Sequence, residues 1–334
     1  MDDYYLSDRP RNKRKLIVIT TIITVVVVAL GIVYHVFFAA PKLHASSDRF
    51  VVSARVDIPD LTAELKSQGY IRRISVFDYL LAKKHVTDIA PGTYTISQSM
   101  NIFQVVSVFV NSPTEYLVVI PPGLRKEEIA KIIGDKFNWT AAQTQEFLDA
   151  TDQSPDYFEG VYFPDTYLIP KTDTPAGVAK RLQAHFEEKF APYAKLAAQQ
   201  NMKWTTVIKI ASLVQREAGG KADMPIIAAV IWNRLAQNMK LQIDATVQYA
   251  RGDTGAGWWA PITHADESID SPYNTYMYKG LPPHPISNPG LDAITATINS
   301  ASTTCVYYIH DSDRNIHCAT TNEEQNANIK KYLE

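Results

Sequence analysis

The sequence lacks an excess of charge of either sign. Lysine and arginine number 33 against 35 acidic residues, so the formal net charge is -2 and the isoelectric point lies near 6.5. Proteins that bind nucleic acids through phosphates carry a basic surface, and we therefore expect no nucleic-acid partner. With 334 residues, 46% of them hydrophobic, the chain can still build about two or three small domains.

Cysteine is scarce, since the chain holds only Cys305 and Cys318. The CxxC and HxxxH spacings of zinc sites are missing around them, so we expect no metal site with His310 or His317, and no cofactor. Between the cysteines, two short apolar runs flank the turn-rich residues 311–314, a pattern that predicts a β-hairpin. A cross-strand disulfide and a reduced pair buried in a core both fit this pattern.

Residues 16–40 contain no lysine, arginine, aspartate or glutamate. A run of about 20 apolar residues is enough to cross the hydrocarbon core of a membrane. The run is too long for the apolar core of about 7–15 residues in a cleaved signal peptide, which is the competing interpretation. Basic residues precede it at positions 9, 11, 13, 14 and 15, so we expect residues 1–15 in the cytoplasm and the chain after about residue 40 outside. The sequence predicts a single-pass transmembrane helix in the cell membrane.

Residues 49–152 alternate short strand and helix patterns. Strands are predicted at 50–56, 92–96 and 115–120, and helices at 59–68, 75–84, 101–110 and 126–135. An Ile-Pro pair at 58–59, before one helix, recurs at 120–121 before another, which suggests two small α+β modules. Exported modules of this size often bind glycans, although packing against a neighbouring domain explains the same pattern.

Two further segments are rich in turn formers. The aromatic stretch 158–170 could line a saccharide groove or pack in a core, and residues 279–290 hold too many prolines for a helix or a central strand. We expect the proline-rich residues to form a stiff surface segment. Between these segments a long amphipathic helix is predicted at 174–200, with His185 at the edge of its apolar stripe rather than acting as a base.

Glu217 ends a predicted helix that begins near Trp204 and runs into Gly219 and Gly220. The negative end of the helix dipole and burial against apolar neighbours both disfavour the charged carboxylate. Such a carboxylic acid can stay protonated near neutral pH and donate a proton. Taken alone, the stretch also fits a solvated glutamate near a helix end. After the next predicted helix, 224–239, Asp244 stands at an N-cap position.

Several motifs follow in a fixed order: ASLVQREA, AAVIWNRL, LQIDATVQYA, YNTY and GLPPHPISNPG. Together they resemble the YceG-like family of membrane-anchored endolytic murein transglycosylases. The resemblance implies an α+β chain with a transmembrane helix at 16–40, a LysM-like α+β region at 49–152, and a mainly helical, lysozyme-like catalytic domain with β additions at 153–334. It also implies cleavage of the MurNAc-GlcNAc bond of nascent peptidoglycan strands to leave 1,6-anhydro ends, with cell-wall synthases as partners.

The resemblance makes Glu217 the catalytic residue, at the second acidic position of the family's A-S-[IL]-[IV]-E-[KR]-E run. The first acidic position is Gln215 here, so a partner carboxylate two residues earlier is missing. Residues two apart do not share a helix face, and Glu217 therefore keeps the role alone. His284 replaces the glycine of the family's GLPPG pattern and puts a titratable ring near the expected groove.

Polar residues in the same motifs are the expected substrate-binding groups. They are Arg234, Gln242, Asp244, Tyr273, Asn274 and Thr275. For Asn274 a turn closed by its own hydrogen bonds is the alternative role, and for Asp244 it is the helix cap.

Two other functions stay open. A hydrolase would need a second carboxylate about 5 Å from the first, or about 6.5–9.5 Å away with a water between them. The candidates for this second carboxylate are Asp223, Asp244, Asp266 and Glu267. A non-catalytic scaffold that binds glycans or the cell-wall synthesis machinery would not need Glu217 at all.

Overall fold

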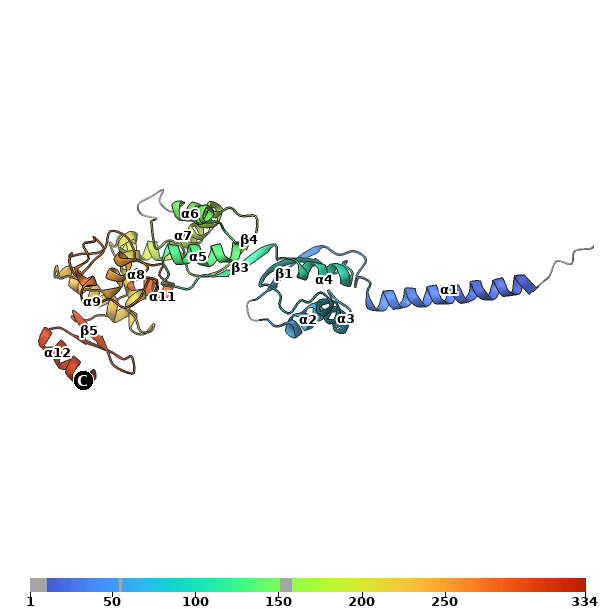
Figure 1. Cartoon of the computed structure of the whole chain (residues 1–334). Coiled ribbons are helices and arrows are strands. Elements are labelled where there is room, and N and C mark those ends of the chain that lie inside the picture. Colours follow the sequence, from blue (N-terminus) through green and yellow to red (C-terminus); the bar gives the residue numbers. More distant parts are fainter. Residues whose placement is uncertain (1–10, 54–55, 151–157) are drawn as a thin grey trace, which may run out of the picture. The chain divides into compact units, whose positions relative to one another are not determined.

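The computed structural model describes residues 11–53, 56–150 and 158–334, without the side chains of residues 11 and 12. The described chain forms two compact units, an N-terminal unit of residues 1–117 and a C-terminal unit of residues 118–334 (Figure 1). Helices and small sheets occur in both, so the expected α+β class is confirmed.

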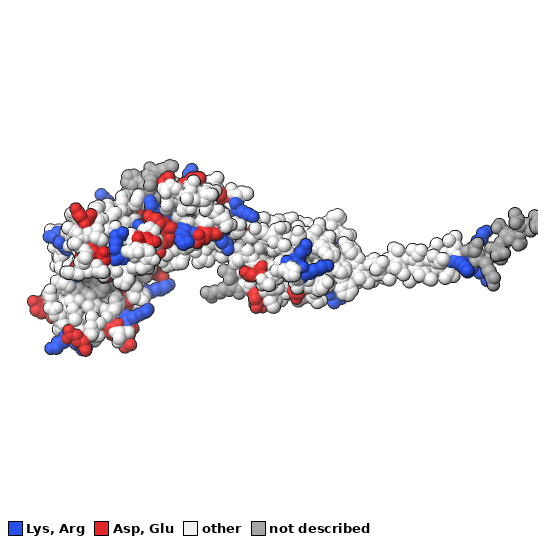
Figure 2. Space-filling model, in the orientation of Figure 1, with Lys and Arg blue, Asp and Glu red and all other residues white. Residues whose placement is uncertain are grey.

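Helix α1 (Arg11–Phe37) is the predicted membrane helix. Within it, residues 13–37 are long and apolar enough to cross a membrane, and none of the apolar stretch is buried in the protein. On the face drawn in Figure 2, the charged side chains of this helix lie at its N-terminal end and the rest of the helix is uncharged. Residues 1–10 of the expected cytoplasmic tail lie outside the described residues.

The rest of the N-terminal unit is a strand–helix–helix–strand arrangement with one more helix. Its elements are β1 (Ser47–Val52), α2 (Ile58–Ser67), α3 (Ile74–Lys83), β2 (Gly92–Ser97), α4 (Ile102–Val110) and the start of β3 (Glu115–Val119). Strand β2 pairs antiparallel with β1 and with the first residues of β3. The predicted strand at 50–56 starts earlier, because Ser47 to Arg49 also pair with β2. Residues 54 and 55 of that prediction lie outside the described residues.

Alternation along β1 decides which face of this small sheet is covered. Phe50 and Val52 are buried, whereas Val51 between them is exposed. Phe50 lies edge to face against Tyr70 and Phe109, so the helices of the unit pack on this one face. Helix α4 begins with a capping box in which Asn101 and Gln104 bond each other's backbone N–H groups.

The C-terminal unit is mainly helical. Its elements are α5 (Lys126–Phe137), α6 (Ala141–Asp149), β4 (Thr166–Pro170), α7 (Pro175–Gln199), α8 (Trp204–Glu217), α9 (Met224–Ala236), α10 (Asp244–Arg251), a 3₁₀ helix (Asp266–Ser268), α11 (Leu291–Ile298), β5 (Tyr307–His310), β6 (Ile316–Ala319) and α12 (Asn322–Tyr332). Helix α8 is central, since it contacts α7, α9, α10 and α11. The middle of α8 is buried, so its sequence is apolar on several faces.

Helices α5 and α6 belong to this C-terminal unit. Helix α6 packs against α5 and α7, and the Trp259 indole N–H donates to Glu128 of α5 at 2.9 Å. The division between the units therefore falls at residues 117 and 118, whereas the sequence placed the end of the LysM-like region after residue 152. That predicted boundary itself lies outside the described residues.

The aromatic stretch that begins at Phe158 is part of the core, which was the alternative to a saccharide groove. Val161, Tyr162 and Phe163 are each at most 5% exposed. Gly160 before them has a φ of 82°, and a Cβ there would come within 3 Å of Pro285 and Ile208. Only glycine fits this left-handed conformation and close approach.

The proline-rich segment was predicted to lie on the surface, and this prediction is wrong for its second half, residues 285–289, whereas Lys279 and Pro283 are exposed. It forms no helix or strand, but Ile286, Ser287 and Asn288 are fully buried. The N–H of Ile286 donates to the Ser212 hydroxyl of α8, and that of Asn288 donates to the carbonyl of Leu124. Prolines contribute no N–H group, so the buried segment has few donors to satisfy and needs no regular structure.

Glu159 is buried against this segment. Its carboxyl accepts hydrogen bonds from the Asn288 side chain and from the N–H groups of Lys126 and Gly160. Burial raises the pKa of its carboxyl to about 7, and the nearby Glu127 charge adds to this. The folded state therefore favours the protonated form of Glu159 more strongly than the unfolded chain does.

This carboxyl predicts a pH-dependent stability. A raised pKa in the folded state gives stability that is complete below the ordinary value of 4.5 and is lost as the pH rises through about 7. We expect the free energy of unfolding to fall by on the order of 3 kcal/mol across this range. In the Glu159→Gln variant, which does not titrate, urea unfolding midpoints at about pH 5 and about pH 8 should differ less than in the wild type. Equal pH dependence in both proteins would contradict the role of Glu159.

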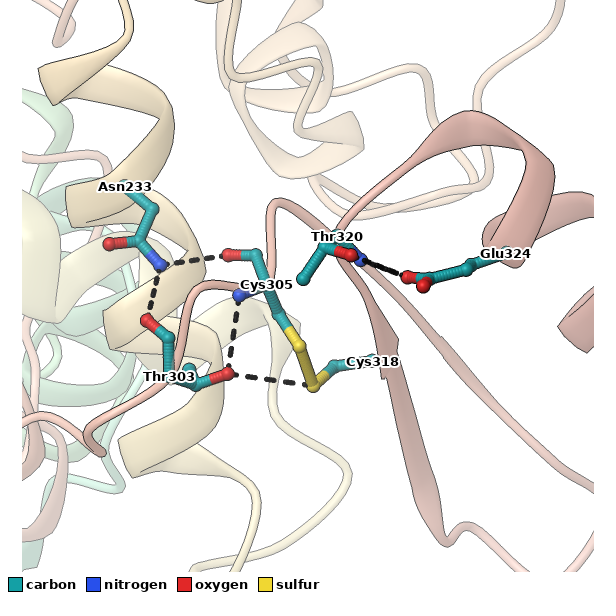
Figure 3. The surroundings of a disulfide bond; sticks show 6 residues. All are labelled: Asn233, Thr303, Cys305, Cys318, Thr320 and Glu324. Carbon is teal, nitrogen blue, oxygen red and sulfur yellow. Dashed lines mark hydrogen bonds between the residues drawn. A yellow bond between two sulfur atoms is a disulfide. The ribbon is translucent and has the colours of Figure 1, made fainter.

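Strands β5 and β6 form the predicted hairpin, and Cys305 and Cys318 are joined by a disulfide (Figure 3). The hairpin is also attached to α9, because the Asn233 side-chain amide donates to the carbonyls of Thr303 and Cys305 at 2.8 and 2.9 Å. The disulfide and the amide together hold the start of β5 against the helical core.

Replacing both cysteines with serine should destabilise the C-terminal unit by about 2–3 kcal/mol, because the bridge closes a loop between residues 13 apart. The shift would be measured as a lower urea midpoint under oxidising conditions. A reductant should lower the midpoint of the wild type to that of the variant, and identical midpoints of both oxidised proteins would refute the expectation.

Candidate active site

Glu217 is the last residue of α8, as predicted, and Ala218 ends the helix by donating its N–H to the Val214 carbonyl. Leu213 and Val214, which precede the site on α8, are fully buried, whereas Glu217 keeps part of its surface exposed. The C-terminal end of α8 thus places the Glu217 carboxyl group where the core meets solvent.

The Glu217 carboxylate accepts a hydrogen bond of 2.6 Å from the hydroxyl of Tyr308 on β5. Tyr308 was missing from the residues predicted from the sequence, because it lies 91 positions away in a hairpin motif without chemistry of its own. Alternation along β5 could have indicated it, since Tyr308 and His310 share one strand face.

Burial is the largest influence on the Glu217 carboxyl and raises its pKa, as the position at the end of α8 suggested. The negative charge of Asp244 also raises this pKa. The Tyr308 hydrogen bond and the nearby His310 and Arg216 lower it, but the net direction remains upward. The protonated acid therefore persists to higher pH than in an ordinary glutamate.

A cavity of about 230 Å³ opens beside the carboxyl. It is lined by Glu217, Tyr308, Arg234, Gln242, Asp244 and apolar residues of α9 and the 241–243 segment. The structure thus brings together four of the residues predicted for the site, which come from α8, α9, the segment before α10 and the start of α10.

Arg234 supports one wall of this cavity. Its guanidinium donates to the carbonyls of Val306 at 2.6 Å and Leu241 at 2.5 Å, so it ties the start of β5 to the segment before α10. Burial lowers the pKa of Arg234, but a guanidinium keeps its charge at neutral pH. The side chain is therefore placed to hold two walls of the cavity together.

Gln242 and Asp244 also line the cavity and are exposed. Gln242 has a φ of 53°, and its N–H donates to the Thr275 carbonyl at 3.2 Å. The expectation that Asp244 caps α10 is wrong, because it is the first helical residue and makes no capping bond. Its carboxylate instead accepts a 2.6 Å hydrogen bond from the Tyr276 hydroxyl.

Asn274 and Thr275 are buried, with 0% and 2% of their surfaces exposed. The Asn274 amide donates to the carbonyls of Glu267 and Ile269, and the Thr275 hydroxyl accepts the Ile243 N–H. These side chains hold the turn beside the cavity. For Asn274 this is the alternative role considered from the sequence. Both side chains are too buried to contact a sugar.

Tyr273 is not a lining residue of this cavity. Its ring packs 4.7 Å from the ring of Tyr249, between centroids. Burial raises its pKa to about 12, so its hydroxyl stays protonated at neutral pH. Tyr273 therefore packs against α10 instead of lining the cavity.

Gln215 faces away from the Glu217 chemistry and accepts a hydrogen bond from the Gly290 N–H at 3.1 Å. The residue that differs from the family pattern thus anchors the end of the proline-rich segment. The predicted position of His284 near the groove is wrong, because it lines a separate cavity with Trp204 and Lys209 at the other end of α8.

The other candidate carboxylates have partners of their own. Asp223 lies 3.2 Å from the ring nitrogen of His310, and Asp266 lies 3.0 Å from the Arg251 guanidinium. Glu267 is 3.2 Å from His264. Among the cavity-lining residues, Asp244 is therefore the carboxylate that accompanies Glu217. Within the described residues no group of three or more His, Cys, Asp or Glu side chains is arranged to hold a metal ion.

Known proteins are similar to this chain over most of its length. Endolytic murein transglycosylases from Streptococcus pneumoniae D39 and Bacillus subtilis 168 are 26% and 27% identical to this chain and cover 87% and 80% of it. The chain covers 60% of the S. pneumoniae protein and 80% of the B. subtilis protein.

A crystal structure of a YceG-like protein from Listeria monocytogenes is also similar, with 26% identity and a TM-score of 0.63. The match covers 84% of this chain and 98% of that one. The model of the YceG-like family matches residues 50–331, which span most of both units. The chain therefore belongs to the YceG-like family.

Proposed function

We propose that this chain is a membrane-anchored endolytic transglycosylase that cuts peptidoglycan glycan strands with Glu217 as its acid and base. The observation that carries the proposal is the Glu217 carboxyl, which has a raised pKa, a 2.6 Å hydrogen bond from Tyr308, and an open cavity beside it. The similar proteins from S. pneumoniae and B. subtilis are named as endolytic murein transglycosylases, which supports the same activity here.

One carboxyl group suffices for this reaction. Protonated Glu217 donates its proton to the glycosidic oxygen between MurNAc and GlcNAc as the bond from that oxygen to C1 breaks. The carboxylate then takes the proton of the MurNAc 6-hydroxyl while its oxygen bonds to C1. The leaving sugar gains a hydroxyl, the other product is a 1,6-anhydro end, no water is consumed, and Glu217 returns to its protonated form.

Tyr308 acts as a positioning residue in this scheme. Its hydroxyl donates to the Glu217 carboxylate, so it stabilises the charge that exists between the two proton transfers. The disulfide, Asn233 and Arg234 hold the strand that carries Tyr308. The exposed Gln242 and Asp244 are the cavity residues that we assign to contact the sugar.

The arrangement of the chain supports a membrane-bound enzyme that acts outside the cytoplasm. We assign α1 to a single pass of the bacterial cell membrane, with the basic N-terminal residues in the cytoplasm. In this proposal the N-terminal unit carries the LysM-like module, the C-terminal unit is the lysozyme-like catalytic domain, and cell-wall synthases are partners.

A peptidoglycan hydrolase is the second candidate, because Asp244 shares the cavity with Glu217. A hydrolase would use this carboxylate to activate water or to attack C1. A non-catalytic scaffold has less support, since it does not need an acid with a raised pKa beside an open cavity.

Asp244→Asn separates the two enzymes. For a transglycosylase we expect turnover of glycan strands to fall less than about tenfold, whereas a hydrolase that uses Asp244 should lose about 10²–10⁴-fold. Because the Asp244 charge raises the pKa of Glu217, the alkaline limb of the pH–rate profile should also move to lower pH in the variant. Loss of activity as complete as in a Glu217 variant would favour hydrolysis.

A further inference from the structure

The end of α1 is bound directly to the N-terminal unit. The Phe38 carbonyl accepts the Ile102 N–H at 3.1 Å, and the Ala40 carbonyl accepts the Arg72 guanidinium at 2.8 Å. The Lys42 N–H donates to the Gln98 carbonyl at 2.9 Å. No free linker therefore separates the apolar helix from the unit, which must lie at the membrane surface when α1 spans the membrane.

Aromatic contacts join the end of α1 to the starts of α3 and α4. The Phe38 ring stacks on Phe103 of α4 with 5.4 Å between centroids. The Arg73 guanidinium, at the start of α3, lies 5.6 Å above the Phe37 ring. Aromatic and arginine side chains gather at membrane–water interfaces, so the starts of α3 and α4 are placed at that interface.

A groove of about 640 Å³ lies between these two helices. Its apolar wall consists of Leu80, Phe103, Val106 and Val110, and Lys83 and Lys84 stand at the C-terminal end of α3. Both ends of α3 meet the interface when this helix lies along the membrane surface. Phe103 and Val110 are 48% and 41% exposed, so apolar side chains of the groove face solvent. The groove is continuous with the end of α1 through Phe103.

We propose that the α3–α4 groove binds the surface of the membrane that α1 spans, with its apolar wall among the upper acyl chains and its lysines on anionic phospholipid headgroups. Apolar side chains beside lysines are the chemistry of interfacial membrane binding. The proposal rests on the membrane anchoring proposed above. It gives the N-terminal unit a fixed orientation on the bilayer.

The test uses the full chain reconstituted into vesicles of phosphatidylglycerol and phosphatidylcholine. A fluorophore is attached to a new cysteine at Ser107, an exposed residue of the groove, and its quenching by brominated lipid is measured. Ser53→Cys is the matched control, since it is an exposed serine just after β1 on the uncovered side of the sheet. A third label at Val27 in α1 reports insertion of the helix itself.

We expect quenching at position 107 to exceed that at position 53 at least twofold. In the Lys83→Gln/Lys84→Gln variant the quenching at 107 should fall in phosphatidylglycerol and stay unchanged in phosphatidylcholine. Equal quenching at positions 107 and 53, with the Val27 label still quenched, would overturn the proposal. It would also be overturned if soluble glycan strands removed the quenching of the 107 label by brominated lipid. An unquenched Val27 label would instead overturn the membrane anchoring on which the proposal rests.

Discussion

Replacing Glu217 with glutamine is expected to lower the turnover of purified glycan strands by about 10²–10⁴-fold, the usual contribution of a general acid and base. The amide has the size of the carboxyl, and its oxygen can still accept the Tyr308 hydroxyl, so the cavity should keep its shape. It has no acidic proton to donate to the glycosidic oxygen. Turnover is measured as release of soluble fragments under single-turnover conditions.

Glu188→Gln provides the matched control. Glu188 is an exposed residue of α7 outside the cavity, so this variant should cleave at the wild-type rate. Circular dichroism and the urea midpoint should be the same for both variants. If the Glu217 variant is as active as the control, Glu217 is not the catalytic acid.

Tyr308→Phe should have the second largest effect, lowering turnover by about 10–100-fold. A hydrogen bond to a charged group contributes about 1.5–3 kcal/mol, and this one stabilises the Glu217 carboxylate between the two proton transfers. The same hydrogen bond lowers the pKa of Glu217. Its removal should therefore raise that pKa and move the alkaline limb of the pH–rate profile to higher pH.

The direction of this pH change distinguishes positioning from a general loss of structure. Asp244→Asn should move the same limb to lower pH, because it removes a negative charge that raises the pKa of Glu217. Tyr307→Phe, on the same strand, keeps the ring beside Arg234 and should leave both rate and profile unchanged. An unchanged profile in Tyr308→Phe would exclude the proposed role of Tyr308.

The parts of the molecule that depend on local pattern were predictable from the sequence. The long apolar helix α1 follows from an uncharged apolar run, and the end of α8 at Glu217 follows from the glycine pair after it. The raised pKa of Glu217 has the cause expected from its buried neighbours. The hairpin at 306–317 was also predicted, although only the structure decides between a disulfide and a reduced pair.

Other features depend on contacts between distant residues. Tyr308 meets Glu217 only after the hairpin has folded onto α8 and α9. Asp244 was expected as a helix cap because its local sequence fits that role. Its carboxylate instead accepts a hydrogen bond from the Tyr276 hydroxyl, 32 positions away. Local pattern does not report such pairs.

The proline-rich segment shows a second limit. Its composition suggested a surface loop, but Ser212 and Leu124 supply the hydrogen-bond partners that allow it to be buried. Asn274 and Thr275 were expected to contact sugars because their side chains are polar. In the structure these polar groups form hydrogen bonds inside a turn. Polar residue type alone does not distinguish a ligand contact from an internal hydrogen bond.

The chemistry of the product ends tests the central claim most directly. Purified glycan strands would be digested with the full chain, treated with borohydride, and analysed by mass spectrometry. A transglycosylase that uses Glu217 alone predicts 1,6-anhydro ends, each lighter by one water than a hydrolysed end and resistant to borohydride. Reducible ends in their place would contradict the account and assign hydrolysis to this cavity.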